Sequence, residues 1–430
     1  MSLDIVLAEH LKKAVGFPQL DVTATIILGG LSFEALSVTA LTRRERYVDD
    51  MFEDSVITVA TTPSQYTELI QYGHENIVLS VNRRPISGGN IVSNRYRAVL
   101  VENRDSKLEG NIADVDTVAA GDNSSFSLVT FQLIPFSAYD LRLREVGGTF
   151  RDETPFGVMR YFLSKMLLKD DYNRSEFVGK IETDTGLNST RYRAIQVKEG
   201  LPLLAVPDYL HERFGFSNEG VGCFLKRQTW YLFKPYTMSK YQEDVPKLTV
   251  INAPPSRYSQ LERNYTQIGN TLTIAATGET RHVKHSDAQA LNAGIGLRFA
   301  SLDTLMPREG STKPKNTPKD YMTSVRNRDY GNEFNRVATD KNRVTDNIGR
   351  TMSMLALQSG EIVETVWENG TIDFLVPGMA TKFIYAKNGK VETMHGTLIS
   401  AEELVSIPHG GMVDRRYQSN VKLTLFLKRD

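Results

Sequence analysis

Residues 421–428 of the chain read VKLTLFLK. Apolar and polar side chains alternate along this stretch, which is the period-two pattern of a β-strand with one buried face. The apolar face carries Val421, Leu423, Leu425 and Leu427, and the polar face carries Lys422, Thr424 and Lys428. A strand so close to the end of a chain is usually fixed inside a sheet. The stretch therefore predicts a β-rich C-terminal region.

Turn signals surround this strand on its N-terminal side. Asn369-Gly370 and Asn388-Gly389 each lie between strand-forming runs, and Asn-Gly supplies the two positive-φ residues of a type I′ hairpin. Pro377-Gly378 fits the centre of a type II turn. The last 80 residues are thus predicted to be a series of short strands joined by tight turns.

The N-terminal part has a similar character after a short predicted helix over 4–15. Six runs rich in Val, Ile, Thr and Phe follow, at residues 22–28, 34–41, 55–60, 77–81, 96–101 and 126–134. Six strands in this span indicate a closed or sandwiched antiparallel sheet. The sixth run resembles residues 421–428, and a polar, Gly-bearing loop precedes each. This echo suggests two related small β-barrels.

Between the two strand-rich parts the pattern changes. Thr154-Pro155 is an N-cap followed by proline at the first helical position, and Pro207-Asp208 opens a second short helix that ends at Gly215. A strand run over 222–233 completes a mixed α/β module. Residues 279–346 lose all periodicity, and between residues 281 and 346 they carry 12 Lys and Arg against 8 Asp and Glu. We interpret them as a long polar insertion suited to docking on an acidic neighbour.

Composition limits the possible functions. The chain has 430 residues, of which 40% are hydrophobic and 24% charged, as in a folded protein of two to four domains. Lys plus Arg and Asp plus Glu number 51 each, so no overall field attracts nucleic acid or membrane. The first 30 residues lack a signal-peptide pattern, and no 18-residue apolar segment occurs, which predicts synthesis in the cytoplasm.

Motifs for catalysis and cofactor binding are missing from the sequence. No dinucleotide-binding, P-loop, zinc-protease or hydrolase-elbow motif occurs. We interpret the single cysteine, Cys223, as a buried inert thiol, and the trio His282, His285 and Asp287 as a solvated polar loop in preference to a metal site. The pair Glu402-Glu403 and the pair Asp49-Asp50 are adjacent in sequence and so do not form an acid/base dyad. We therefore predict no enzymatic activity and assign no catalytic, cofactor or metal residues.

Two basic clusters and one aromatic run allow both a functional and a structural interpretation. Arg43-Arg44 with Arg46, and Arg83-Arg84, are able to contact an anionic partner, but we favour a solvated rim at strand ends. The aromatic side chains at 230–236 could form a stacking platform for sugars or bases. Their alternation more often indicates core packing or a subunit contact.

The order of three segments resembles the baseplate hub proteins of contractile-tailed bacteriophages. They are Leu248-Thr249-Val250-Ile251-Asn252-Ala253-Pro254-Pro255, Glu262 to Tyr265, and Leu272 to Gly278. The helix over 207–216, its Trp-bearing strand and Pro235-Tyr236 are similar to the end of that family's middle domain. The closing turns are similar to the family's second barrel. The resemblance covers residues 205–275 and 345–430, and the first 150 residues match in pattern only. The long insertion departs from the family.

The resemblance implies a β-rich α+β fold in which two small antiparallel, tail-tube-like β-barrels flank a mixed α/β module. The implied domains are 1–150 for the first barrel, 151–245 for the middle domain, 246–278 with 347–430 for the second barrel, and 279–346 for the insertion. The type VI secretion spike has a similar unit at its N-terminal end.

The implied function is structural. Three chains would form a ring of six similar domains that adapts the hexameric tail tube to the trimeric central spike, with a hydrophilic lumen for the genome. The implied partners are two further copies of the chain, the tail tube protein, the central spike protein and other baseplate proteins. Membrane and sequence-specific nucleic-acid binding are not expected, and the implied location is the virion baseplate, assembled in the host cytoplasm. The alternatives are another β-rich tail component, such as a tube initiator or receptor-binding protein, and a cell-wall hydrolase.

Overall fold

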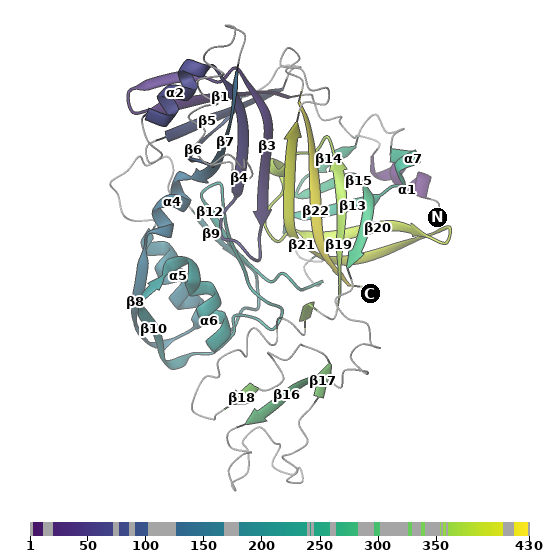
Figure 1. Ribbon diagram of the computed structural model, residues 1–430. Helices are drawn as coiled ribbons and strands as arrows, with labels where there is room; N and C mark the ends of the chain where they lie inside the picture. Colours follow the sequence, from purple (N-terminus) through teal and green to yellow (C-terminus); the bar gives the residue numbers. More distant parts are fainter. Residues whose placement is uncertain are drawn as a thin grey trace, which may run out of the picture.

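The structure is a computed structural model of the whole chain. It describes residues 3–11, 20–71, 77–85, 91–101, 126–166, 180–238, 241, 245–258, 264–282, 296–301, 326–328, 337–339, 353, 356–357, 360–406 and 417–428. It is rich in strands, as the sequence predicts. Strand-rich parts precede and follow the middle module in the sequence (Figure 1). None of the helices in the described part is long and apolar enough to cross a membrane.

Six N-terminal strands form the first of two similar sets, here called the N-terminal unit. They are β1 (Leu20–Leu28), β3 (Ser37–Arg46), β4 (Asp54–Thr61), β5 (Ile77–Pro85), β6 (Val92–Leu100) and β7 (Ser127–Pro135). They correspond to the six predicted runs. Their order in the sheet is β1-β5-β6-β7-β4-β3, and every pairing is antiparallel. Alternate residues of β1 are buried, which places one face on a core that includes Ile26 and Phe131.

Six C-terminal strands form a closed barrel, here called the C-terminal barrel. They are β13 (Lys247–Asn252), β15 (Thr271–His282), β19 (Glu361–Glu368), β20 (Ala380–Lys387), β21 (Lys390–Ser406) and β22 (Gln418–Lys428). Pairing runs β21-β20-β13-β15-β19-β22 and returns to β21. β13 is parallel to both of its neighbours, so this barrel is not wholly antiparallel as expected. The predicted inward residues of β22 are all fully buried in the barrel core.

The two sets of strands have the same spatial order. Numbered along the chain within its own set, each runs first, fourth, fifth, sixth, third, second. The sixth strands are β7 and β22, the two whose sequences echo each other. The sets differ in two respects: the first strand has the opposite direction, and no ladder joins β1 to β3 among the described residues.

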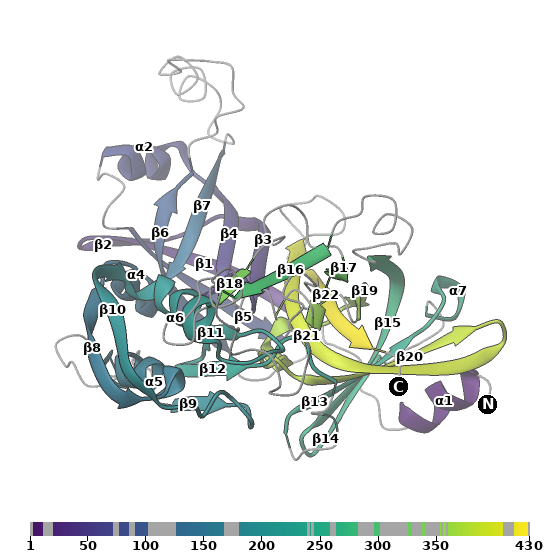
Figure 2. The same ribbon diagram turned by 90° about the horizontal axis from the view of Figure 1, so that it is seen from below.

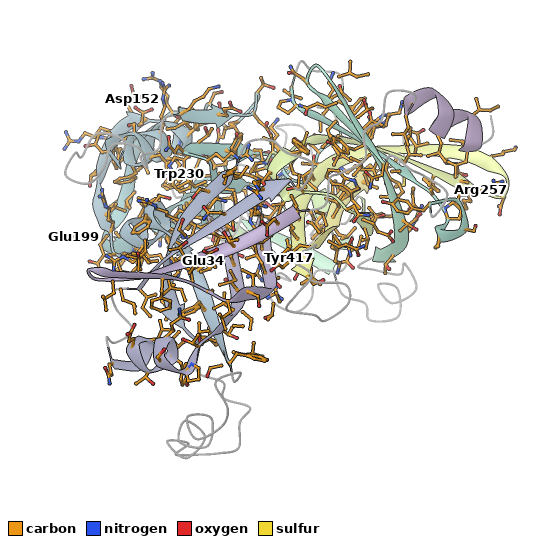
Figure 3. All side chains as sticks on the ribbon, turned by 90° about the horizontal axis from the view of Figure 1, so that it is seen from above. Glu34, Asp152, Glu199, Trp230, Arg257 and Tyr417 are labelled. Carbon is orange, nitrogen blue, oxygen red and sulfur yellow. The ribbon has the colours of Figure 1, made fainter. Side chains whose placement is uncertain are left out.

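The second strand of the N-terminal unit pairs with the fifth strand of the C-terminal barrel. β3 lies antiparallel to β21 from Ala40–Ser406 to Arg46–Ser400, so one continuous sheet crosses both units. The far ends of β21 and β22 extend beyond the barrel into the gap between β3 and β1. There Tyr417 bridges to Leu20 of β1, and its hydroxyl donates to the carbonyl of Val38 at 2.8 Å. Figure 3 shows Tyr417 beside the N-terminal strands.

The middle module contains two small sheets and two helices. β8 (Glu145–Glu153) pairs with β10 (Tyr192–Pro202), and β9 (Lys180–Thr183) lies beside the hairpin of β11 (Gly222–Lys226) and β12 (Thr229–Phe233). The helix α5 (Pro155–Met166) begins as predicted, because the Thr154 hydroxyl accepts from the Gly157 amide. The helix α6 (Val206–Phe214) ends as predicted, because Gly215 closes it. Trp230 is fully buried among them (Figure 3).

The remaining elements are short. They are α1 (Leu3–His10), β2 (Leu31–Glu34), α2 (Pro63–Gln71), α4 (Phe136–Arg142), η3 (Leu203–Ala205), α7 (Pro255–Tyr258), β14 (Tyr265–Ile268), η6 (Ile372–Phe374) and the three-stranded sheet of β16 (Gly296–Ser301), β17 (Arg326–Arg328) and β18 (Val337–Thr339). β15 continues to His282, so residues 279–282 of the predicted insertion belong to the barrel. Most of the insertion lies outside the described residues.

Two of the three predicted turns form. Asn388 and Gly389 both have positive φ between β20 and β21, and Gly378 has φ 71° in the turn after Pro377. The prediction of a hairpin at Asn369-Gly370 is wrong. After β19 the chain enters η6, which Thr371 caps by accepting from the Asp373 amide at 3.3 Å. This detour brings Asp373 to the site described next.

Candidate functional site

Seven charged side chains meet where the N-terminal unit, the C-terminal barrel and the middle module come together. We call this group the ionic junction. Its members are Arg43, Glu45, Glu53, Arg83, Lys226, Asp373 and Glu403. They come from β3, the loop before β4, β5, β11, η6 and β21. Charges this well buried are stable in a fold only when they are paired.

Arg43 on β3 is the centre of the ionic junction. Its guanidinium donates through Nε and Nη2 to the two oxygens of Glu53, at 2.9 and 3.1 Å. The remaining nitrogen, Nη1, donates to Asp373 at 3.1 Å and to Glu403 at 3.0 Å. A bidentate pair of this kind is both strong and directional. Arg43 thus connects the N-terminal unit to two elements of the C-terminal barrel.

Arg83 on β5 completes the charge balance around the same two carboxylates. Its guanidinium lies 2.6 Å from Asp373 and 3.3 Å from Glu403. The other oxygen of Glu403, which is fully buried, accepts from the Ser419 hydroxyl at 3.0 Å. Both ends of the Glu403 carboxylate are therefore satisfied inside the protein.

The middle module reaches the ionic junction through Lys226 at the end of β11. Its ammonium donates to Glu45 at 2.5 Å and to the carbonyl of Ile372 in η6 at 2.9 Å. The Tyr47 hydroxyl also donates to Glu45, at 2.6 Å. One lysine thus joins β11 of the middle module to β3 and to η6. The ionic junction ties all three parts of the fold together.

Protonation of the carboxylates follows from their neighbours. Burial opposes ionisation of Glu53, but Arg43 more than compensates, and the pKa of Glu53 falls to about 2. The pKa of Asp373 is likewise lowered, because Arg43 and Arg83 outweigh its burial. Glu45 differs: burial raises its pKa despite the opposing effect of Lys226.

A half-open cavity of about 330 Å³ adjoins the ionic junction. Arg43, Glu53, Lys226 and Asp373 contribute to its wall, as do residues of β6 and of the turn after β11. At its rim Arg227 lies 3.4 Å from Asp373. Each carboxylate of the ionic junction is engaged by an Arg or Lys side chain. The described residues contain no group of three or more side chains placed to hold a metal ion.

The opposite face of the same strands is exposed and carries charges of alternating sign. On β3 and β21, Arg44 pairs with Glu402 at 2.7 Å, and on β22 and β19 Lys422 pairs with Glu364 at 3.0 Å. Arg46 pairs with Asp50 at 2.7 Å. Because side chains alternate along a strand, Arg43 and Glu403 point inward while Arg44 and Glu402 point outward.

The solvated-rim interpretation of the basic clusters is therefore half wrong. The side chain of Arg43 is 5% exposed and that of Arg83 also 5%, whereas Arg44 is 51% and Arg84 58% exposed. A basic pair on a strand places one residue on each face, and here the inner face meets buried carboxylates. The rim interpretation holds for Arg44, Arg46 and Arg84.

The other sequence candidates fall into three groups. Cys223 is buried, and burial raises the pKa of its thiol; Trp230 and Phe233 are core residues, as predicted. Glu402 and Glu403 point to opposite faces, also as predicted. His282 is the last residue of β15, and His285 and Asp287 lie outside the described residues.

Sequence reasoning missed four members of the ionic junction as site residues: Glu45, Glu53, Lys226 and Asp373. A charged residue in an otherwise apolar strand was the available signal for Lys226, which follows Phe224-Leu225. Glu45 offered no such signal, since its neighbours on β3 are the charged residues Arg44 and Arg46.

Comparisons with known proteins give structural matches alone. No family model matches the chain, and no curated protein matches it in sequence. The 43 kDa tail protein of prophage MuSo2 from Shewanella oneidensis is similar with a TM-score of 0.47 and 11% identity, over 95% of this chain and 99% of that one.

A chain of the half-lidded Francisella PdpA–VgrG complex is similar with a TM-score of 0.42 and 8% identity, over 98% of this chain and 61% of that one. The lidded complex gives 0.41 and 8%, over 100% of this chain and 56% of that one. The present chain thus spans less than two thirds of those chains. A prophage tail protein and complexes that contain VgrG are among the structures to which it is similar.

Proposed function

We propose that the chain is a structural virion protein: the trimeric hub of a contractile-tail baseplate, which joins the hexameric tail tube to the trimeric central spike. One observation carries this proposal. Two six-stranded sets with the same strand order lie side by side in one chain and share a continuous sheet through β3 and β21. We interpret them as two related tail-tube-like barrels, within the domain limits expected from the sequence except that the second barrel continues to His282.

Two such units in each chain would allow a trimer to match both the sixfold symmetry of the tail tube and the threefold symmetry of the central spike. Three chains contribute six units of similar surface to the tube, while the middle module, present once per chain, faces the spike with threefold symmetry. The ionic junction supports this role. It fixes the angle between the two units and the middle module, which a ring of defined size requires.

The exposed face of the joined sheet supports a lumen for the genome. It crosses both units, and its cations and anions alternate as Arg44, Glu402, Lys422 and Glu364. Phosphate binding needs an excess of Lys and Arg. A balanced face would let DNA pass without holding it, and no enzymatic activity is part of this proposal.

The proposal is tested by the mass of the purified chain, measured by size-exclusion chromatography with light scattering. A hub should give about three times the 48.3 kDa of one chain, and electron micrographs should show rings with six similar lobes. A chain that stays monomeric when concentrated, and when mixed with its spike protein, would contradict the proposal. Clearing of purified peptidoglycan by the chain would point instead to a hydrolase.

A further inference from the structure

The joint between β3 and β21 uses the edge of the second strand of the N-terminal unit and the edge of the fifth strand of the C-terminal barrel. The equivalent edges, on the second strand of the C-terminal barrel and the fifth strand of the N-terminal unit, are not part of this joint. The second strand of the C-terminal barrel is β15, and the fifth strand of the N-terminal unit is β6. These two strands lie toward opposite sides of the molecule, with β3 and β21 between them (Figures 1 and 2). We propose that the end of β6 in one copy of the chain pairs with the end of β15 in a second copy, in the same way that β21 pairs with β3. This inference rests on the proposed trimer and names the surfaces that form it.

β15 resembles β3 at the point where the joint begins. Each strand has a register shift in its ladder with the third strand of its set, between Val38 and Ala40 in β3 and between Thr277 and Thr280 in β15. In β3, pairing with β21 starts at Ala40, directly after the shift. In β15, pairing with β13 ends at Ala276, and Thr280 to His282 pair only with β19 among the described residues. Among the described residues, the side of β15 away from β19 is therefore an open strand edge from Thr277 to His282.

β6 resembles β21 in the same way. β21 pairs with β20 as far as Thr397, and it then continues as the strand that meets β3. β6 pairs with β5 as far as Arg97 and continues beside β7, where the Val101 amide donates to Thr130 at 2.9 Å. Within the described part of the chain, no strand pairs with Leu100 on the side away from β7. The backbone groups there are available for an added strand.

The end of the β6–β7 hairpin is also apolar on its outer face. Val99 is 38% exposed, Val101 43% and Leu128 58%. Exposed apolar side chains next to an open strand edge are typical of β-sheet addition by a partner. A second copy of the chain is the partner that fits, because its β15 edge is equivalent to the β3 edge that β21 already occupies.

Such a contact is heterologous: each copy contributes a β6 edge to one neighbour and a β15 edge to the other. A heterologous contact forms a closed ring when its rotation divides a full turn. Within one chain, the β3–β21 joint connects one unit to the next. If β6 and β15 form an equivalent joint between chains, three chains give a ring of six units in which the two kinds of joint alternate.

Lysine substitutions test the two edges separately, because edge lysines are the means by which natural sheets prevent strand addition. The β6 variant is Val99→Lys with Val101→Lys, and the β15 variant is Thr280→Lys. The matched control is Ile91→Lys with Val92→Lys, which changes exposed apolar residues at the other end of β6. Far-ultraviolet circular dichroism and thermal unfolding establish that each variant is folded.

Light scattering should give a trimer for the wild type and the control, and a monomer for each edge variant. Mixing the two edge variants is the decisive step. Each retains the edge that the other lacks, so one contact forms and the ring cannot close. The mixture should therefore contain a dimer of twice 48.3 kDa.

A trimeric wild type whose edge variants remain trimeric overturns this inference and leaves the hub proposal in place. So does a mixture that stays monomeric, since it would mean that the contact is not between these two edges. A wild type that stays monomeric when concentrated, and when mixed with its spike protein, contradicts both proposals.

Discussion

Replacing Arg43 by methionine should destabilise the protein far more than the same change at the next residue. Arg43 and Arg44 are neighbours on β3, and each faces a glutamate on β21: Glu403 on the inside and Glu402 on the outside. Arg43→Met removes a buried guanidinium, and Arg44→Met removes an exposed one. The pair of variants isolates the effect of burial, because residue type, strand and cross-strand partner are matched.

The magnitude follows from the carboxylate that loses its partner. Without Arg43, the hydrogen bonds of Glu53 in the described part of the chain come from the hydroxyls of Ser55 and Tyr96, whereas Asp373 and Glu403 still face Arg83. Breaking a buried ion pair by removing one partner costs about 3–5 kcal/mol, and the persistence of Arg83 favours the lower end. An exposed pair such as Arg44–Glu402 contributes about 0–1 kcal/mol. We therefore expect a difference of at least about 2 kcal/mol between the two variants.

Urea unfolding followed by tryptophan fluorescence measures this difference. The two tryptophans are both fully buried, Trp230 in the middle module and Trp367 in the C-terminal barrel, so they report on two parts of the fold. Adding Glu53→Gln to Arg43→Met removes the stranded charge and should restore part of the loss. Equal free energies of unfolding for Arg43→Met and Arg44→Met would refute the conclusion that the ionic junction holds the three parts of the fold together.

Three further predictions concern the stability of the protein in acid, the closure of the C-terminal barrel and the reactivity of the Cys223 thiol. The pKa of Glu53 is lowered from 4.5 to about 2, so its contribution to stability is present above pH 4.5 and lost as the pH falls toward 2. Acid titration of the unfolding free energy should show this loss, and Glu53→Gln should reduce it but not abolish it, because the pKa of Asp373 is also lowered. Glu45, whose pKa is raised, acts in the opposite sense and cannot produce the loss. A Cβ at Gly396 would overlap the carbonyl oxygen of Phe426 across the β21–β22 ladder, so Gly396→Ala should cost more than about 3 kcal/mol, against about 1 kcal/mol for Gly389→Ala in the open hairpin turn; comparable thermal shifts would count against barrel closure at this contact. Burial and the raised pKa of its thiol should prevent Cys223 from reacting with a disulfide reagent until denaturant is added, and fast labelling of the native chain would contradict its packing in the middle module.

Local pattern determined much of this fold. The alternation in residues 421–428 identified the buried face of β22, and Asn388-Gly389 identified the turn between β20 and β21, because these signals depend on neighbouring residues alone. The Thr154 cap is of the same kind. Likewise, alternation separates Glu402 from Glu403, since successive side chains in a strand point to opposite faces.

Tertiary structure decided what covers each face. Arg43 and Arg44 are the same residue type in adjacent positions, yet one is buried, because Asp373 and Glu403 lie 330 and 360 residues farther along the chain and meet it only after folding. The same long-range demand overrides the turn signal of Asn369-Gly370, since η6 must carry Asp373 to Arg43. The strand order shared by the two units, the reversed direction of β13 and the joint of β3 with β21 are likewise beyond local pattern. Period-two alternation shows which residues share a face, whereas pairing between distant strands decides which faces and edges are closed.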